Sequence, residues 1–169
     1  MVNTRVRTAA VLLGIGLGGF IDGILLHQVM HWHNMFSAVV PPTTMEGMLF
    51  NMRADGLFHL VTWLVTLAGV LVLWSAFGHG GTLPSTRGFL GTMLVGWGWF
   101  NLVEGFVNHI ALDLHHVRDV PEHVPALDWA FLLVAGAGFI ALGMLLRRGG
   151  PRRIPDRRAG YERRGTALQ

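Results

Sequence analysis

The sequence predicts an all-α integral membrane protein, a four-helix transmembrane bundle with both termini in the cytoplasm. Hydrophobic residues make up 51% of the 169 residues, charged residues make up only 14%, and the mean hydropathy is +0.46. The apolar residues gather in four segments, each close to the roughly 20 residues that a membrane-spanning helix needs. The arginines gather at one end of these segments, which predicts the orientation.

The four segments lie at residues 6–33, 53–77, 87–112 and 127–147. Each is expected to be helical, because a bilayer offers no water to the backbone N–H and C=O groups. Residues 1–149 should therefore form one membrane domain. Residues 150–169 are rich in Arg, Pro and Gly and are expected to form a basic, disordered cytoplasmic tail.

Arginine sets the predicted orientation, because the chain contains no lysine. Arg5 and Arg7 lie at the start of the first segment, Arg87 lies at the start of the third, and eight arginines lie at or after the end of the fourth. The positive-inside rule places both termini and residues 78–87 in the cytoplasm. Eight of the ten acids and eight of the nine histidines then fall in the outer loops or in the outward halves of the helices.

Charge and cysteine content exclude several classes of function. The net charge of +3 comes almost entirely from the C-terminal tail. A basic run next to a helix end is explained by contact with anionic lipid, so the bilayer is the expected partner and nucleic acid is not. The chain has no cysteine, which rules out disulfides, thiolate metal ligands and cysteine nucleophiles.

The first segment combines packing glycines with polar residues. Small residues such as Gly14 and Gly18 allow close approach of a neighbouring helix. His27 and His31 are four residues apart, so they share a helix face and can reach one metal ion. Asp22 precedes His27 by five residues, which is about 140° of rotation on an α-helix. Asp22 therefore either supports the site indirectly or lies where the helix is distorted.

An acid followed by glycine and then by histidine recurs on three segments. The pairs are Asp22 with His27, Asp55 with His59, and Glu104 with His109. Such side chains are costly inside a membrane unless they find partners, so we expect them to converge in one site. The predicted metal ligands and supporting acids are His27, His31, His59, Glu104, His109, Asp55, Asp22 and Asp113.

The third segment has two polar faces, and the fourth has none. If the third helix continues a few residues past 112, one face holds Asn101, Glu104, Asn108 and His115, and an adjoining face holds His109, Asp113 and His116. Two polar faces suit a helix at the centre of the assembly. The fourth segment has no ionisable residue between Asp128 and Arg147, so it is expected to be scaffold.

The residue types leave the metal open among copper, zinc and iron. Five of the eight methionines lie in or beside the first outer loop, at Met30, Met35, Met45, Met48 and Met52. Thioether and imidazole ligands favour Cu(I), although methionine is also a common packing residue. Histidine and carboxylate ligands suit zinc and iron equally well. A proton or salt-bridge network without metal is a further interpretation.

The stretches DGILLHQVMHWHNM, RADGLFH and NLVEGFVNHIALDLHHVRD resemble a family of small bacterial four-helix membrane proteins catalogued as a domain of unknown function. The resemblance covers roughly Thr8 to Leu146. It implies a bacterial plasma membrane and four helices, and it transfers no activity. In size and histidine placement, members of this family resemble small accessory proteins of haem-copper oxidase assembly.

The favoured function is metal handling, most simply copper delivery to a respiratory oxidase as an assembly factor. The alternative is a membrane metalloenzyme, a di-metal hydrolase or oxidase in which Glu104 acts as general base. A second alternative is a proton-coupled transport subunit. The absence of an obvious polar path through the inner halves of the segments weighs against transport.

Overall fold

The computed structural model describes residues 3–77 and 82–148, and this part of the chain is all helical with no β-strand. The all-α prediction is therefore confirmed. Four long helical segments contain, in order, α1 (Thr4–Asp22) with the π-helix η1 (Gly23–Val29), α2 (Met45–Phe77), α3 (Thr86–Glu104) with η2 (Gly105–Ala111), and α4 (Pro125–Ala130) with η3 (Phe131–Gly138) and α5 (Phe139–Leu146). The predicted tail at residues 150–169 lies outside the described residues.

Polar side chains define where three of the segments begin. Asn3 accepts a hydrogen bond from the backbone N–H of Arg5, and Ser85 accepts one from Gly88. Thr44 accepts one from Gly47, so α2 begins at Met45, eight positions earlier than the apolar pattern predicted. These oxygens satisfy backbone donors that a helix start leaves unpaired.

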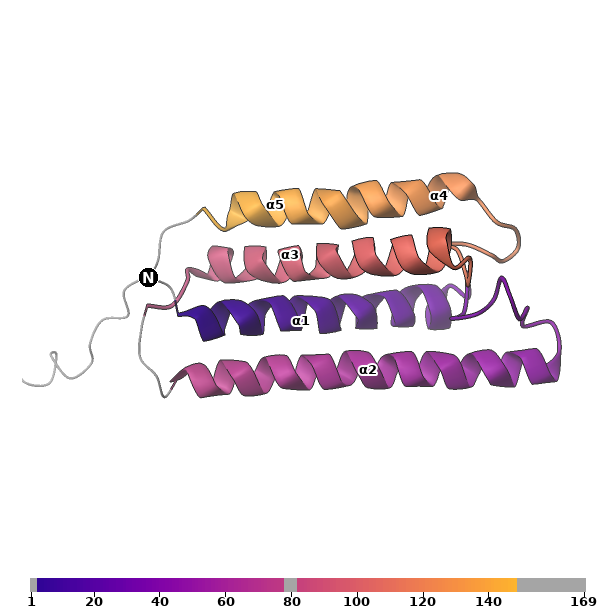
Figure 1. Ribbon diagram of the computed structural model, residues 1–169, viewed down its shortest axis with the longest axis horizontal. Helices are drawn as coiled ribbons and strands as arrows, with labels where there is room; N and C mark the ends of the chain where they lie inside the picture. The colour runs from indigo at the N-terminus through magenta and orange to yellow at the C-terminus, as the bar shows by residue number, and fades with distance from the viewer. Residues whose placement is uncertain (1–2, 78–81, 149–169) are drawn as a thin grey trace, which may run out of the picture.

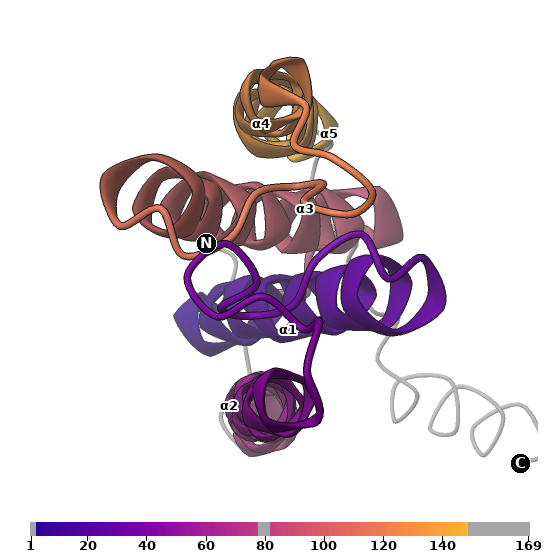
Figure 2. The same ribbon diagram turned by 90° about the vertical axis from the view of Figure 1, so that its right-hand side faces the viewer.

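The four segments lie side by side in a row (Figures 1 and 2). α2 packs on one side of α1, α3 packs on the other side, and α5 with η3 packs on the far side of α3. The two central segments, α1 with η1 and α3 with η2, carry the acid and histidine motifs. The polar residues are therefore placed at the centre of the row.

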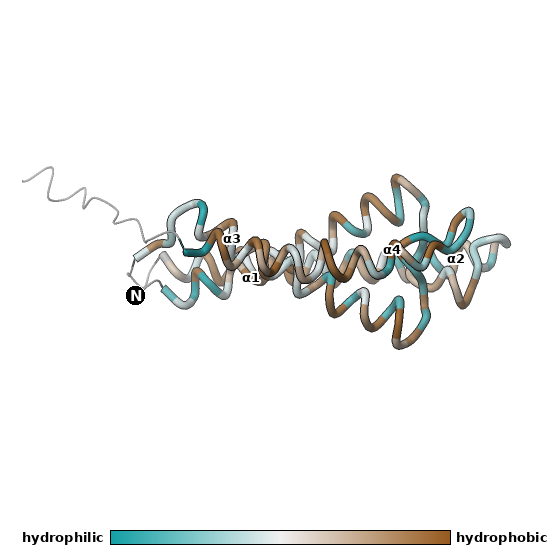
Figure 3. The backbone as a smooth tube through the Cα atoms, turned by 90° about the horizontal axis from the view of Figure 1, so that it is seen from above, coloured by the Kyte–Doolittle hydropathy of each residue, from teal (hydrophilic) through white to brown (hydrophobic). Residues whose placement is uncertain are grey.

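Glycine allows α1 and α3 to cross in close contact (Figure 3). A Cβ at Gly14 would overlap the backbone carbonyl of Met93, and a Cβ at Gly96 would overlap that of Val11. The predicted packing role of the α1 glycines is therefore supported, since Gly14 lies against the backbone of α3 and Gly18 lies against the Trp97 side chain of α3.

The outer helices present apolar side chains to their surroundings. Trp74 is 76% exposed on α2, and Leu133 is 66% exposed on η3. Three helical segments are long and apolar enough to cross a membrane, namely Thr4–Val29, Met45–Ala76 and Pro125–Leu146. The α3–η2 segment runs beside them but is less apolar, because it carries several glycines together with Asn101 and Glu104.

Candidate metal centre

Both central segments change from α-helix to π-helix at an acid–glycine pair. α1 gives way to η1 after Asp22, and α3 gives way to η2 after Glu104. In a π-helix the hydrogen bonds join residues five apart, so such residues lie almost one above the other. Asp22 therefore lies 3.6 Å from His27, and Glu104 lies 3.5 Å from His109. The helix is distorted after Asp22, which is one of the two alternatives predicted for this residue.

His27 is held between two carboxylates. Its Nδ1 lies 2.9 Å from Asp55 Oδ1, and its Nε2 lies 3.6 Å from Asp22 Oδ2. Asp55 is positioned in turn, because Asn34 donates to its Oδ2 at 2.7 Å and the backbone N–H of Met35 donates to its Oδ1 at 2.9 Å. A carboxylate at one ring nitrogen of a histidine directs the other nitrogen toward a ligand.

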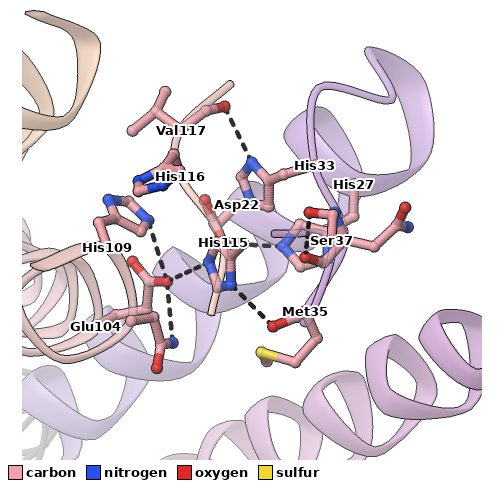
Figure 4. A network of polar contacts seen from close by, with 12 residues as sticks. Asp22, His27, His33, Met35, Ser37, Glu104, His109, His115, His116 and Val117 are labelled. Carbon is pink, nitrogen blue, oxygen red and sulfur yellow. Dashed lines mark hydrogen bonds and ion pairs between the residues drawn. The ribbon is translucent and has the colours of Figure 1, made fainter. Parts of the chain in front are cut away.

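His33 and His115 follow the two π-helices and cross to each other's chain segment. His33 Nδ1 donates to the carbonyl of Val117 at 3.0 Å, and His115 Nδ1 donates to the carbonyl of Met35 at 3.0 Å. Carbonyl oxygens only accept hydrogen bonds, so both Nδ1 atoms carry the proton. Each Nε2 atom then points inward, and the two rings stack with centroids 4.6 Å apart (Figure 4).

Glu104 joins the second half of the cluster. Its Oε1 lies 2.9 Å from His115 Nε2 and 3.5 Å from His109 Nε2. The other nitrogen of His109 lies 3.5 Å from Asp128 Oδ1. His109 thus sits between two carboxylates, as His27 does. We call the set His27, His33, His109, His115, Asp22 and Glu104 the buried histidine centre, since every member is buried.

The two halves of this centre repeat each other. Ser37 and Asp119 are 82 positions apart in the chain, and the same offset relates His27 to His109 and His33 to His115. The hydrogen bonds repeat as well, because the exchanged carbonyls belong to Met35 and Val117, which the offset also relates. The centre therefore lies on an approximate two-fold axis between α1 and α3.

A strained turn follows each π-helix at equivalent positions. His31 has φ of 50° and Asp113 has φ of 53°, in the left-handed region that side chains with a Cβ rarely adopt. Each turn reverses the chain so that the residue two positions later, His33 or His115, reaches the centre. Backbone strain of this kind persists where the surrounding structure enforces it, commonly at functional sites.

The structure brings together five of the eight predicted site residues: Asp22, His27, Asp55, Glu104 and His109. It does not bring in His31, which is exposed because the helix ends at Val29 and the expected four-residue spacing is lost. Asp113 is also exposed, and its contact is with His116.

His59 lies close to the centre without joining it. A Cβ at Gly23 would overlap His59 Nε2, so this ring packs against the start of η1. It also stacks on Phe20 with ring centroids 6.3 Å apart. Among the described residues, His59 belongs to none of the clusters whose ligand atoms lie close enough to share an ion.

The predicted set omitted His33 and His115, which belong to the centre, and Asp128, which lies against His109. The signal was present in the sequence, because the interval from His27 to His33 recurs from His109 to His115. Asp128 corresponds to Asp55, since the backbone N–H of Val117 donates to Asp128 at 2.8 Å just as that of Met35 donates to Asp55.

The centre has a donor set that fits a metal ion. The ligand atoms of His27, His33 and His115 lie within 4.8 Å of one another, and so do those of Glu104, His109 and His115. Burial lowers the pKa of His33 well below its usual value, and the neighbouring His115 and His27 lower it further. His33 is therefore neutral at physiological pH, which is the form that binds metals.

A pocket of about 840 Å³ leads from the surface to this end of the molecule. His27 and Asp55 lie at its wall, and Met48, Met52 and His116 line it as well. Two of the clustered methionines are thus beside the path to His27, while Met30 and Met45 are exposed elsewhere.

Fold and site together define an all-α membrane protein with a buried cluster of histidines and acids at one end of its helices. The chain belongs to the family described as Predicted membrane protein (DUF2243), whose model matches residues 9–150. No curated protein and no solved structure matches the chain.

Proposed function

We propose that this chain is a metal-handling protein of a bacterial plasma membrane, which holds a transition metal in the buried histidine centre. One observation carries the proposal. His33 Nε2 is buried and has no hydrogen-bond partner among the described residues, although His33 Nδ1 is fixed as a donor. A buried polar atom without a partner costs about 1–3 kcal/mol, and a metal ion at that lone pair would remove the cost.

A network without metal explains the geometry less well. With Asp22 and Glu104 ionised, His115 would have to be doubly protonated to donate to Glu104 as well as to the carbonyl of Met35. His27 would likewise have to carry two protons to offer one to Asp55 and one to Asp22, whose Oδ2 lies 3.6 Å from its Nε2. Two imidazolium rings would then lie with centroids 5.9 Å apart and with His33 beside both. Like charges at this separation oppose each other in a buried site, and His33 Nε2 would still lack a partner.

Copper is the metal that the surroundings favour. Among the divalent first-row metals, copper binds nitrogen and oxygen ligands most tightly, and thioether groups select Cu(I). Met48 and Met52 line the pocket that ends at His27, so both kinds of ligand lie along one path. Copper handling for a respiratory oxidase is the role that the family resemblance suggests, with the bilayer and the oxidase as partners.

We infer that the centre faces the outer side of the membrane, because the arginines lie at the other end of the helices. Arg5, Arg7, Arg87, Arg147 and Arg148 lie at the opposite end of the helices, where α1 and α3 begin and α5 ends. The positive-inside rule assigns that end, with both termini, to the cytoplasm. The centre and its pocket would then face the outer side of the membrane.

Elemental mass spectrometry of the protein purified in mild detergent tests this proposal. Copper near one equivalent that passes within minutes to a competing Cu(I) chelator would support handling. Zinc or iron at one to two equivalents that resists chelation would favour a resident cofactor and the enzyme. Absence of bound metal, even after incubation with each ion, would overturn both.

A groove that reaches Glu104 supports a metalloenzyme as the second candidate function. A groove of about 420 Å³ is lined by Trp99, Phe100 and Val103 and reaches Glu104. The Oε2 atom of Glu104 is buried and has no hydrogen-bond partner within the part of the chain that is described. An apolar substrate entering there would meet a carboxylate able to act as general base.

Replacing Asp55 with asparagine is expected to weaken metal binding about 10- to 100-fold. The amide keeps the shape of the side chain, but it removes the negative charge that orients His27 and raises its basicity. The dissociation constant measured by chelator competition checks this expectation. Glu46→Gln, an exposed acid at the start of the same helix, is the matched control and should bind like the wild type.

A further inference from the structure

A second group of metal-binding side chains lies outside the buried histidine centre. His116, His123 and Asp128 place one ligand atom each within 4.8 Å of the others. The rings of His116 and His123 stack with centroids 3.6 Å apart and an interplanar angle of 12°. Both rings therefore present their edges in the same direction, toward one carboxylate oxygen.

That oxygen is Oδ2 of Asp128. His123 Nε2 lies 2.8 Å from it and His116 Nδ1 lies 3.4 Å from it. The second nitrogen of His116 lies 3.1 Å from Asp113, to which it can donate its proton. His116 Nδ1 is buried and has no hydrogen-bond partner among the residues that the structure describes, so a lone pair faces a carboxylate. A cation between them would relieve that repulsion.

The approximate two-fold repeat provides an internal comparison. The position equivalent to His116 in the first half is Asn34, and the acid equivalent to Asp128 is Asp55. There the Asn34 amide donates to Asp55 at 2.7 Å, so the carboxylate is satisfied within the protein. In the second half, the equivalent position holds His116, whose imidazole can bind a metal.

We propose that His116, His123 and Asp128 form a second transition-metal site, the outer histidine site, which takes a divalent ion such as Cu²⁺ or Zn²⁺ from the aqueous side. His123 is exposed, and both histidines line the pocket of about 840 Å³ that also reaches His27. Imidazole and carboxylate are ligands that both ions accept.

Asp128 connects this site to the buried histidine centre. Its Oδ2 faces the two outer rings, whereas its Oδ1 lies 3.5 Å from His109 Nδ1. An ion in the outer histidine site is therefore one carboxylate away from a member of the centre. This arrangement suits a site that takes up a metal ion before the ion reaches the buried histidine centre. Only this role as a first binding site rests on the proposed function.

Equilibrium dialysis of the purified full chain against Cu²⁺ or Zn²⁺ tests the second site. The double variant His116→Asn and His123→Asn copies the arrangement at Asn34 and should lose one bound equivalent while the fold is kept. His33→Ala should lose a different equivalent. His31→Asn, an exposed histidine beside the same pocket, should lose none.

The outcomes separate the two proposals. One equivalent removed by the double variant, with a matching component lost from the Cu²⁺ electron paramagnetic resonance spectrum, supports the outer histidine site even if the buried centre binds nothing. An unchanged stoichiometry in the double variant overturns the outer site. Loss of every equivalent in both the double variant and His33→Ala overturns the separation into two sites.

Discussion

His33→Ala is expected to weaken metal binding at the buried histidine centre by more than about 100-fold. Removing a residue that only supports a metal ligand already weakens binding about 10- to 100-fold, so removing a ligand should weaken it more. His33 would be a direct ligand, fixed by its hydrogen bond to Val117 and neutral because burial lowers its pKa. Elemental analysis after dialysis, together with chelator competition, measures the effect.

His31→Ala is the matched control for this experiment. His31 is two residues away, is exposed, and belongs to none of the ligand clusters found in the described residues. Its removal should leave the bound metal unchanged. The unfolding temperature of both variants in detergent shows whether the helices remain assembled. Retention of metal by His33→Ala, or its loss from His31→Ala, would contradict the assignment of ligands.

The internal repeat explains why a site forms at this end of the molecule. α1 and α3 cross where Gly14 and Gly96 face the opposing backbones, and the chain then continues into η1 and η2. Equivalent turns return His33 and His115 to the axis, where each donates to the other half. Each half therefore completes the hydrogen bonds of its partner, and neither half builds the site alone.

The fold class was predictable because bilayer thickness and hydropathy constrain it strongly. The end of the first helix and the start of the second were less predictable. Apolar residues beyond Val29 extended the first predicted helix too far. Glu46, Asn51 and Arg53 interrupt the apolar pattern of the second, so its predicted start at residue 53 came after the observed start at Met45. Caps and π-helical turns depend on individual hydrogen bonds, which hydropathy does not encode.

Part of the site was predictable from a repeated sequence motif. The repeated acid, glycine and histidine pointed to two pairs that lie together in the structure, Asp22 with His27 and Glu104 with His109. Helical periodicity then favoured His31 over His33, because it assumed an α-helix where the chain is π-helical and turns at a positive φ. Comparing the first half of the sequence with the second would have identified His33 and His115 as equivalents.

Gly14→Ala is expected to destabilise the assembly by about 2–3 kcal/mol or more, because overpacking a tight core contact typically costs about 1–3 kcal/mol. The new Cβ would overlap the carbonyl oxygen of Met93, and a backbone atom cannot move aside as the end of a side chain can. Separation of α1 from α3 would also part the two halves of the buried histidine centre. The variant should therefore lose bound metal along with stability, and unfolding followed by tryptophan fluorescence measures the first effect.

Gly56→Ala separates this packing effect from the general preference of helices for alanine. Gly56 lies within α2, and a Cβ there would meet nothing within 4 Å among the described residues. Alanine is favoured over glycine in helix interiors by about 1 kcal/mol, so this variant should be as stable as the wild type or more stable. Equal destabilisation by the two substitutions would mean that the α1–α3 crossing is looser than the structure has it. Destabilisation confined to Gly14→Ala, with metal lost in parallel, would tie the centre to that crossing.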